Sequence, residues 1–476
     1  MPVPWDGWSS DIVTCVDEPC QGHTKSHQAA GFAIRGPQHH NIGCEGGSTI
    51  KPRIFRSFLL AALAALPCAA PAEFRAAAVK VEITPDRPQW LLGYAARRST
   101  GVHDPLYHRV LAMDDGKTQF FLASTDIALV SPAFYDEFCE ELNKQTGIRA
   151  GQVWWAATHT HSAPEVGPPG LPRAFLGNRY DHEPDWEYAR RVKTSLIDSI
   201  REARAKLAPA RLSVGVTTAM ANINRRARDA EGRIWLGMNP EGPVDRQVGL
   251  IRLERPDGSL IALVANYAMH GTVLGGANTL ISGDAPGIVA GYVEEKLNAP
   301  VLFLNGAAGD IAPIYSVYPD FKSSHINEFK VLLGDRILAG NRAMGPATSK
   351  VSLRAAEKVL ETPLKSGLTW PDELQQYAAA GGVRQVRLPL RFLRINDTGI
   401  WAAPLELFCE IAMDIRNQSP FARTFYFGYT NGWLGYMPTR KAFPEGGYET
   451  TVTPFTGEAE ASLKKTVLTA LREIRR

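Results

Sequence analysis

Apolar positions follow two patterns from about residue 75 onward. Short apolar runs that end in polar or glycine-rich stretches predict buried strands, and apolar positions three or four residues apart predict helices. The predicted strands span residues 109–113, 119–123, 153–157, 212–218, 248–253, 260–268, 300–304, 399–404 and 425–430, with an edge strand at 78–85. The predicted helices span residues 132–146, 187–206, 286–297, 326–338, 407–415 and 459–474. This succession indicates one α/β domain.

The first 75 residues show neither pattern. Residues 1–50 lack an apolar period, and we expect them to be a disordered upstream extension that is not native. Residues 51–72 combine a basic segment, an apolar run and small residues, which is typical of a secretory signal peptide. The run is too short for a membrane anchor, and Pro67 makes Cys68 a poor lipoprotein site. The mature protein is therefore predicted to be residues 73–476 and to be secreted or periplasmic.

Composition and charge narrow the class of protein. Of 476 residues, 45% are hydrophobic and 21% are charged, and the net charge of +3 gives no reason to expect a nucleic-acid partner. No stretch after residue 75 approaches the roughly 20 apolar residues that span a bilayer. Only Cys139 and Cys409 lie in the predicted mature chain, where they either form a disulfide or are buried as free thiols.

The candidate chemistry lies at strand ends. The predicted strand 153–157 is followed by His159 and His161, which would share a face if the strand continued that far. Two imidazoles at the end of a buried strand suit metal binding or proton transfer, although a structural pair is an equally good interpretation. The strands 260–268 and 300–304 also end in polar, glycine-rich loops, one of which contains His270. Such loops are where α/β proteins assemble their sites.

Several motifs together resemble the N-terminal catalytic domain of the neutral/alkaline non-lysosomal ceramidases. The matching stretches are GYA with TGVHDPLYHR, THTHSAPE, NINRR, NYAMHGT with LISGD, AAGDIAP, PLE, and GYMPT with GGYE. They occur in the family's order from about residue 78 to residue 450, which makes the combination specific although each motif alone is weak. The resemblance implies mixed β-sheets flanked by helices and a zinc-dependent amidase.

The resemblance also implies a set of site residues. The predicted Zn²⁺ ligands are His159, His270, Glu406 and Tyr436, and the residues expected to line the site are His161, Arg225 and Tyr448. Taken alone, His270 is typical of a satisfied core histidine, and Glu406 of a charge at a helix N-terminus. Their joint occurrence in the family's order favours a metal site. Three protein ligands with a weakly held fourth position are the pattern of a catalytic zinc that activates water.

Two departures from the family concern the substrate. The ceramidases carry a serine, assigned as a nucleophile, where this chain has Gly306, and they continue into an immunoglobulin-like domain after the last motif. The resemblance therefore predicts the metal site without predicting ceramide as the substrate.

The predicted function is a secreted zinc-dependent hydrolase that cleaves an amide (N-acyl) or ester bond. Without a serine, metal-activated water would attack the carbonyl directly. His161 is the candidate acid/base, and Arg225 with Tyr448 would hold the oxyanion or a substrate carboxylate. Asp126 and Asp310 are predicted to orient the ligands or their loops.

Two alternatives remain open from the sequence. One is a metal-dependent carbohydrate-active or lactone-cleaving enzyme on the same scaffold, for which Trp154, Trp155 and Trp433 would suit sugar stacking, although burial in the core is the better interpretation of the first two. The other is a non-catalytic secreted binding protein in which Gly306 marks a lost activity. In each case the expected partner is a small molecule or a lipid- or glycan-like substrate. The His-x-His patterns of amidohydrolase barrels and of metallo-β-lactamase-like enzymes fit less well, because strands precede the pair and Ser162-Ala163 follow it.

Overall fold

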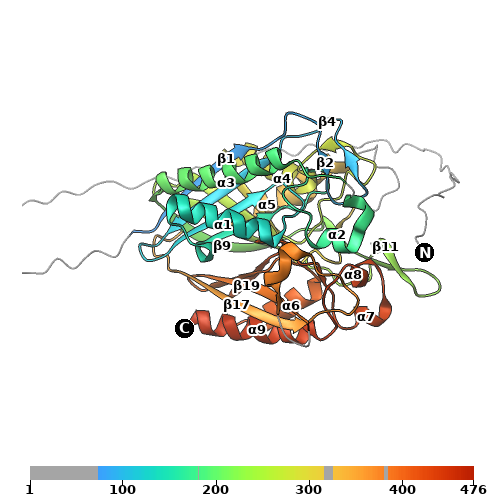
Figure 1. Cartoon of the computed structure of the whole chain (residues 1–476). Coiled ribbons are helices and arrows are strands. Elements are labelled where there is room, and N and C mark those ends of the chain that lie inside the picture. The colour runs from blue at the N-terminus through green and yellow to red at the C-terminus, as the bar shows by residue number, and fades with distance from the viewer. Residues whose placement is uncertain (1–72, 181, 316–324, 380–383) are drawn as a thin grey trace, which may run out of the picture. The chain divides into compact units, whose positions relative to one another are not determined.

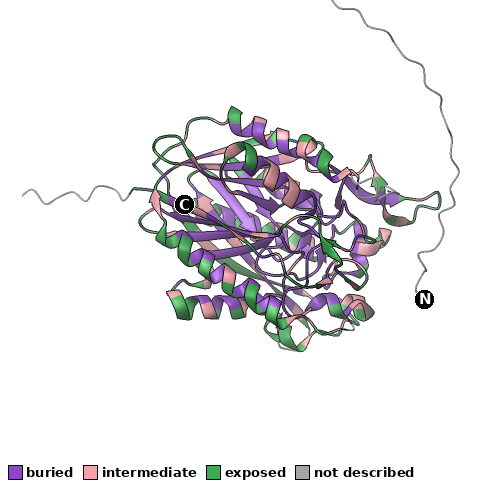
Figure 2. Ribbon diagram, turned by 90° about the horizontal axis from the view of Figure 1, so that it is seen from above, coloured by how far each residue is buried: buried purple, intermediate pink, exposed green. Residues whose placement is uncertain are grey.

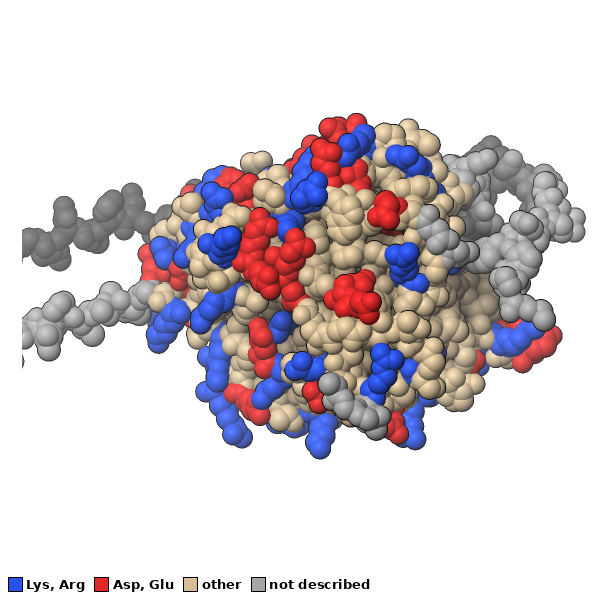
Figure 3. Space-filling view, viewed as in Figure 1, with Lys and Arg blue, Asp and Glu red and all other residues tan. Residues whose placement is uncertain are grey.

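The computed structural model describes residues 73–180, 182–315, 325–379 and 384–476 (Figure 1). The predicted upstream extension at 1–50 and signal peptide at 51–72 lie outside the described residues. Within the described part of the chain, no helix has the length and apolar character needed to cross a bilayer. Lys and Arg side chains mix with Asp and Glu on the face seen in Figure 3.

The first sheet has the strand order β7-β6-β5-β1-β8. Its strands are β1 (Arg75–Glu82), β5 (Tyr107–Asp114), β6 (Gln119–Thr125), β7 (Val153–Ala157) and β8 (Ala208–Pro209). The strands β1, β5 and β6 are antiparallel, whereas β7 runs parallel to β6. Helices α1 (Pro132–Thr146) and α3 (Trp186–Ala205) pack on one face of this sheet (Figure 1). The predicted edge strand at 78–85 is observed as β1, which begins earlier, at Arg75, and ends at Glu82. Its residues 78–82 pair with β5 alone, whereas β8 pairs only with Arg75 and Ala76.

The second sheet has the strand order β15-β13-β12-β9. Its strands are β9 (Arg211–Thr218), β12 (Gln247–Glu254), β13 (Leu260–Tyr267) and β15 (Val301–Asn305), with β15 parallel to β13. Helices α4 (Asp284–Leu297) and α5 (Asp335–Ala343) cover its outer face. The helix predicted at 326–338 is instead a 3₁₀ turn (His325–Glu328), a π-helical segment (Lys330–Gly334) and the start of α5.

The third sheet has the strand order β17-β19-β20-β22. Its strands are β17 (Leu353–Pro363), β18 (Ala378–Ala379), β19 (Gln385–Ile395), β20 (Thr398–Ala402) and β22 (Arg423–Phe427). The strands β20 and β22 are parallel, and helices α6 (Cys409–Gln418) and α9 (Ala459–Arg475) pack against the sheet (Figure 1). The helix predicted to begin at residue 407 begins at Cys409, because Glu406 and Leu407 pair with another strand.

One apolar cluster joins the three sheets. It includes Trp154 of β7, Val264 of β13 and Phe427 of β22, all nearly inaccessible to solvent. Figure 2 shows this buried interior between the helices. Burying apolar side chains from three sheets in one core fixes the strand ends relative to one another. Those ends therefore supply a rigid base for the loops that follow them.

Short elements complete the described chain. They are β2 (Trp90–Leu91), β3 (Arg97–Arg98), β4 (Gly101–Val102), β10 (Asn222–Arg228), β11 (Ile234–Asn239), β14 (Leu280–Ile281), β16 (Ile311–Pro313), β21 (Glu406–Leu407), β23 (Tyr436–Met437), α2 (Leu171–Leu176), α7 (Ala442–Glu445) and α8 (Tyr448–Thr451), with 3₁₀ turns at Ala150–Gln152, Gly177–Tyr180 and Asp372–Tyr377. Cys139 and Cys409 are both free and buried, so of the two predicted states the buried thiol is correct.

Candidate metal centre

The site is built where five strands end. Loops that follow β7, β13, β15, β20 and β22 are joined by backbone hydrogen bonds between sheets. The amide of Ala157 donates to the Tyr429 oxygen at 3.1 Å, and the amide of Gly428 donates to the Asn305 oxygen at 2.9 Å. The His159 oxygen accepts from the Gly271 amide at 3.1 Å. These bonds bring segments far apart in the sequence to one point.

His159 has an unusual backbone conformation. Strand β7 ends at Ala157, and His159 has φ 63°, in the left-handed region that non-glycine residues rarely adopt. The prediction that two histidines share one face of a continuing strand is therefore wrong. The His159 amide donates to the Ile127 oxygen, and the Tyr429 ring stacks on the imidazole at 4.0 Å between centroids. Backbone strain of this kind costs on the order of 1–3 kcal/mol and clusters at functional sites.

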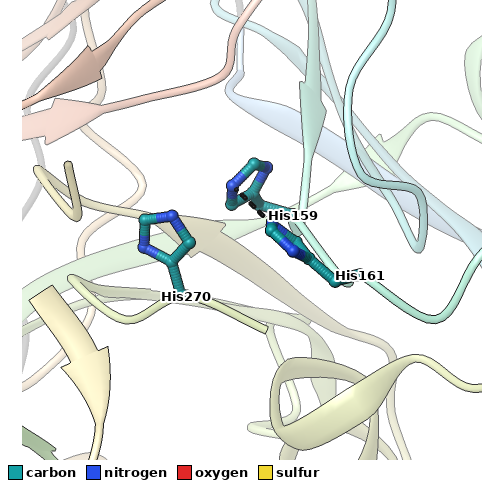
Figure 4. A group of neighbouring side chains, drawn as sticks. All are labelled: His159, His161 and His270. Carbon is teal, nitrogen blue, oxygen red and sulfur yellow. Dashed lines mark hydrogen bonds between the residues drawn. The ribbon is translucent and has the colours of Figure 1, made fainter. Parts of the chain in front are cut away.

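Three imidazoles nevertheless converge (Figure 4). One ring nitrogen each of His159, His161 and His270 lies within 4.8 Å of the others. The Nε2 atoms of His159 and His161 are 3.1 Å apart. His159 and His270 are 2% and 0% exposed, whereas His161 is partly exposed. The cluster is thus reached from the side of His161.

Backbone oxygens fix the orientation of two of these rings. Nδ1 of His159 lies 2.7 Å from the Ala128 oxygen, and Nδ1 of His270 lies 3.0 Å from the Ile311 oxygen. Because a backbone oxygen only accepts, each Nδ1 carries a proton, so Nε2 is the ring atom that can offer a lone pair to a metal ion. Burial lowers the pKa of His270 to about 4, so its ring is neutral near pH 7.

Glu406 completes the group of donors. Its Oε2 lies 2.9 Å from Nε2 of His270 and 3.3 Å from Nε2 of His159. Burial opposes ionisation, but the two imidazoles hold the pKa of the Glu406 carboxyl well below its ordinary value. Trp433 donates its indole N–H to Oε1 at 2.9 Å, and the Tyr429 hydroxyl donates to Oε2 at 3.2 Å. Both aromatic residues therefore position this carboxylate.

The donor set fits a divalent metal ion. Two imidazoles with bare Nε2 atoms, a carboxylate and a third imidazole are the usual protein ligands of catalytic zinc. Without a cation, the close Nε2 atoms of His159 and His161 require a proton between them. An ion at this point would satisfy both lone pairs and the carboxylate together.

Arg225 links this cluster to the predicted fourth ligand. Its Nη1 lies 3.0 Å from Nε2 of His270, its Nη2 donates to the Tyr436 hydroxyl at 3.1 Å, and its Nε donates to Glu449 at 2.9 Å. A metal ion and Arg225 cannot share the same lone pair of His270. Arg225 would then keep Tyr436 and Glu449 as partners. Arg225 thus connects Tyr436 to the histidine cluster by hydrogen bonds. Burial raises the pKa of the Tyr436 phenol well above its ordinary value.

Glu449 is a functional candidate that the sequence patterns did not reveal. It is fully buried in α8, and its two oxygens accept from Nε of Arg225 at 2.9 Å and from Nη1 of Arg226 at 2.8 Å. The neighbouring Tyr448 is partly exposed, and its ring centroid lies 5.7 Å from that of Tyr436. The adjacent residues Arg225 and Arg226 could have signalled this partner. Two arginines on a strand of buried residues need a buried carboxylate to balance their charge.

Asp126 and Asp310 were both predicted to orient ligands or their loops, and the structure gives them different roles. The backbone oxygen of Asp310 accepts from the Arg225 amide at 2.9 Å, and its side-chain Oδ1 accepts from the Cys409 amide at 2.8 Å. Asp310 therefore holds two loops of the site in position, which is the role predicted for it. Asp126 instead pairs with Arg109 at 2.7 Å, and Arg109 also pairs with Glu294. Asp126 nevertheless precedes Ile127 in the chain, and the backbone oxygen of Ile127 accepts a hydrogen bond from the His159 amide. Asp126 is thus part of a buried ion-pair network and not a partner of a ligand.

Asn305 and Gly306, at the end of β15, pack closely against the loops that carry the histidines. The Asn305 side chain accepts from the Met269 amide at 3.0 Å and donates to the Met269 and Thr158 oxygens at 2.8 and 3.2 Å. It therefore ties the two histidine loops together. A Cβ at Gly306 would lie 3.0 Å from the Ala268 nitrogen and 3.1 Å from its Cα. A serine would press on the backbone that carries His270.

Asp310 gives the stability of the protein a pH dependence. Burial raises its pKa to about 7, so the folded state favours the protonated acid and loses stability as pH rises from about 4 through about 7. Asp310→Asn should remove this loss. The variant's free energy of unfolding, measured in urea, should rise relative to the wild type over that range, with about 1.4 kcal/mol for each unit of pKa shift as the upper limit. Parallel curves for the two proteins would contradict the assignment.

Comparison with solved structures defines the class of fold. A crystal structure of neutral ceramidase from Pseudomonas aeruginosa matches with a TM-score of 0.69 and 19% identity, over 84% of this chain and 75% of that one. A structure described as ceramidase complexed with C2 matches with a TM-score of 0.70 and 18% identity, over 84% of this chain and 76% of that one. The predicted fold, a mixed α/β arrangement like that of neutral ceramidase, is confirmed.

Sequence comparison then gives the relatives. Residues 80–313 match the family described as neutral/alkaline non-lysosomal ceramidase, N-terminal. A neutral ceramidase of Pseudomonas aeruginosa is 24% identical over 83% of this chain and 71% of that protein. A neutral ceramidase of Mycobacterium tuberculosis is 26% identical over 50% of this chain and 38% of that protein. The chain is thus a distant homologue of the bacterial neutral ceramidases, and about half of it resembles their N-terminal family.

Proposed function

We propose that the chain is a metal-dependent hydrolase that cleaves an acyl amide or ester bond, with zinc as its ion. The observation that carries the proposal is the convergence of His159, His161, His270 and Glu406 in a chain homologous to neutral ceramidases. A divalent ion bound there supplies a Lewis acid that polarises a carbonyl and acidifies water. The remaining chemistry falls to the side chains around the cluster.

Arg225 and Tyr448 are the proposed oxyanion partners. The Arg225 guanidinium is held in place by Glu449 and Tyr436, so it meets a developing negative charge without reorganising. Tyr448 is partly exposed beside Tyr436, and burial raises the pKa of its phenol, which therefore remains a hydrogen-bond donor at neutral pH. Together they would stabilise a tetrahedral intermediate formed from the substrate carbonyl.

His161 is the proposed acid/base. It is the partly exposed member of the cluster, and burial together with the neighbouring imidazoles holds its pKa well below the ordinary value. A neutral imidazole can take a proton from water and pass it to the leaving amine or alkoxide. Gly306 offers no side chain to act as a nucleophile, so water is the proposed attacking group.

The carbohydrate-active alternative loses its main support in the structure. Trp154 and Trp155 are each 1% exposed, and Trp433 is 3% exposed with its indole N–H directed to Glu406. None of the three presents a face on which a sugar ring could stack. The acyl hydrolase therefore remains the function with a specific observation in its favour.

Removal of the metal provides the test of the proposed function. Protein dialysed against a chelator should hold less than a tenth of the ion and lose hydrolysis of acyl amides and esters, and Zn²⁺ should restore both. The metal would be measured by mass spectrometry and the rates with a panel of acyl amides, esters, lactones and glycosides. Full activity in metal-free protein, or activity confined to glycosides, would refute the proposal.

Secretion is a separate proposal that rests on residues 51–72 alone. Their basic, apolar and small-residue segments are expected to direct export, with cleavage near Glu73. N-terminal sequencing of protein recovered outside the cytoplasm tests this. Recovery of secreted protein that still begins at residue 1 would refute both the signal peptide and the non-native extension.

A further inference from the structure

The turn between β2 and β3 forms a wall beside His161. A Cβ at Gly93, which has φ 110°, would lie 2.4 Å from Cγ of His161, so only glycine permits this approach. The ring of Tyr94 meets the imidazole of His161 edge-on, with centroids 5.0 Å apart. The Glu165 amide donates to the Trp90 oxygen, which joins the hairpin to the histidine loop. This turn thus borders the partly exposed side of the cluster.

Arg97 extends this wall with a positive charge. Its Nε donates to the Asn278 oxygen at 2.8 Å, and its Nη2 donates to the backbone oxygen of His161. The guanidinium also lies 5.0 Å from the centre of the Tyr94 ring. Two backbone oxygens and the face of an aromatic ring therefore hold the guanidinium next to His161 in a fixed orientation.

The charge of Arg97 has no carboxylate partner among the described residues. Its Nη1 is buried without a hydrogen-bond partner, and no described acid forms an ion pair with it. Burial lowers the pKa of Arg97, as expected for a cation without a counter-ion. The oxygens of Asp284 accept from the amides of Val273, Leu274 and Ala285, and this carboxylate forms no ion pair with Arg97.

Other buried arginines of the protein differ from Arg97 in having carboxylate partners. Arg225 has Glu449 as a buried partner, and Arg109 has both Asp126 and Glu294. The guanidinium groups of the arginines that are almost wholly buried, Arg109, Arg225 and Arg226, are all paired with carboxylates, as the cost of desolvation requires. Arg97 is thus a cation beside the candidate active site whose counter-ion is not supplied by the described chain. An anion from outside the protein is the simplest partner.

We propose that Arg97 binds an anionic group of the substrate, so that the preferred substrates are acylated amines or alcohols bearing a carboxylate or a phosphate. This inference rests on the proposed hydrolase function and names the substrate class of the same site. Hydrolysis would consume one water, break the acyl bond and release a carboxylic acid together with an amine or alcohol that keeps the anionic group. A guanidinium suits this role because it binds planar or tetrahedral oxyanions through two N–H groups.

The test compares substrates that differ only in charge. N-dodecanoylglycine is paired with its uncharged glycinamide, and N-dodecanoyl-phosphoethanolamine is paired with N-dodecanoylethanolamine. The zinc-loaded wild type should favour the charged member of at least one pair by about 10-fold or more in kcat/KM, and the pair that shows it distinguishes carboxylate from phosphate. Equal or greater activity on both uncharged members would overturn the proposal.

Variants assign the preference to Arg97. Arg97→Gln should lower the ratio of charged to uncharged kcat/KM by about 10- to 100-fold, mainly through KM, and Arg97→Lys should retain part of it. Arg98→Gln is the matched control, because Arg98 is exposed, adjacent on β3 and bonded to the Pro88 oxygen. A merely structural role of Arg97 would lower activity on both members of each pair equally, which would refute the assignment.

Binding separates this inference from the proposed function. If the wild type hydrolyses no acyl substrate, the hydrolase proposal fails. Calorimetric titration with N-dodecanoylglycine and its glycinamide still measures the role of Arg97 in that case. Tighter binding of the charged compound, lost in Arg97→Gln, would support an anion site. Equal binding of the two compounds would overturn it.

Discussion

His159→Ala is expected to release the metal ion and to abolish hydrolysis. The substitution removes an Nε2 donor that lies 3.3 Å from Glu406 and 3.1 Å from Nε2 of His161. Loss of a residue that merely orients a ligand costs about 10- to 100-fold in metal affinity or activity, so loss of the ligand itself should exceed about 100-fold. Metal content after dialysis and rates with acyl substrates measure the two effects. A variant that kept both would refute the site.

His161→Ala separates two roles that remain for this residue. The proposed mechanism assigns His161 to proton transfer, whereas the structure places its Nε2 among the possible ligand atoms. As an acid/base, its loss should leave the metal bound, lower kcat by about 10²–10⁴-fold and remove one limb of the pH–rate profile. As a ligand, its loss should release the metal, as in His159→Ala. We expect the first result, because His161 is the partly exposed member of the cluster.

Glu449→Ala should have the largest effect on stability. Glu449 is completely buried and is the carboxylate shared by Arg225 and Arg226, whose Nε and Nη1 atoms lie 2.9 and 2.8 Å from it. Removing one partner of a buried ion pair leaves an uncompensated charge and costs about 3–5 kcal/mol. Urea unfolding should show this loss, and the rate of hydrolysis should fall because Arg225 is no longer held in place.

Glu445 provides the control for this experiment. It also pairs with Arg226, at 3.4 Å, but it is partly exposed and extends to the exposed Arg228. Solvent screens such a pair, so Glu445→Gln should change the free energy of unfolding by less than about 1 kcal/mol. Similar losses for Glu445→Gln and Glu449→Ala would mean that the effect does not depend on burial of the charge.

Helices and strands with a regular pattern of apolar residues could be predicted from the sequence. Those with an irregular pattern could not. The strand at 153–157 and the helix at 132–146 were predicted at their observed bounds, because each has a clear apolar pattern. Strands β17 and β19 were missed. Exposed charged residues occur on both faces of β17, so its sequence does not alternate regularly. The strand pairs along its whole length with β19. That pairing is a tertiary contact which no local window contains.

The same distinction applies to the site. His159 and His270 lie just after β7 and β13, Glu406 lies in β21, and motifs at those positions identified them. Tyr429 and Trp433 were missed as partners of Glu406, since their roles depend on contacts across the chain. The left-handed backbone of His159 could not be expected from its residue type. The Gly/Pro-rich loop at residues 164–170 is largely buried, because Pro164 pairs with Leu91 and the loop glycines lie against Ser131 and Phe134 at the start of α1.

The scattered origin of the site residues has a consequence for biosynthesis. His159 and His161 leave the ribosome long before Glu406, which follows β20 of the third sheet. A nascent or truncated chain that ends before residue 406 would carry imidazoles without the carboxylate that binds beside them. Tight binding of the proposed metal ion would therefore have to wait until nearly the whole chain has been translated and folded. If the protein is exported unfolded, it acquires its ion at its destination, and metal content then reports how much of the population has matured.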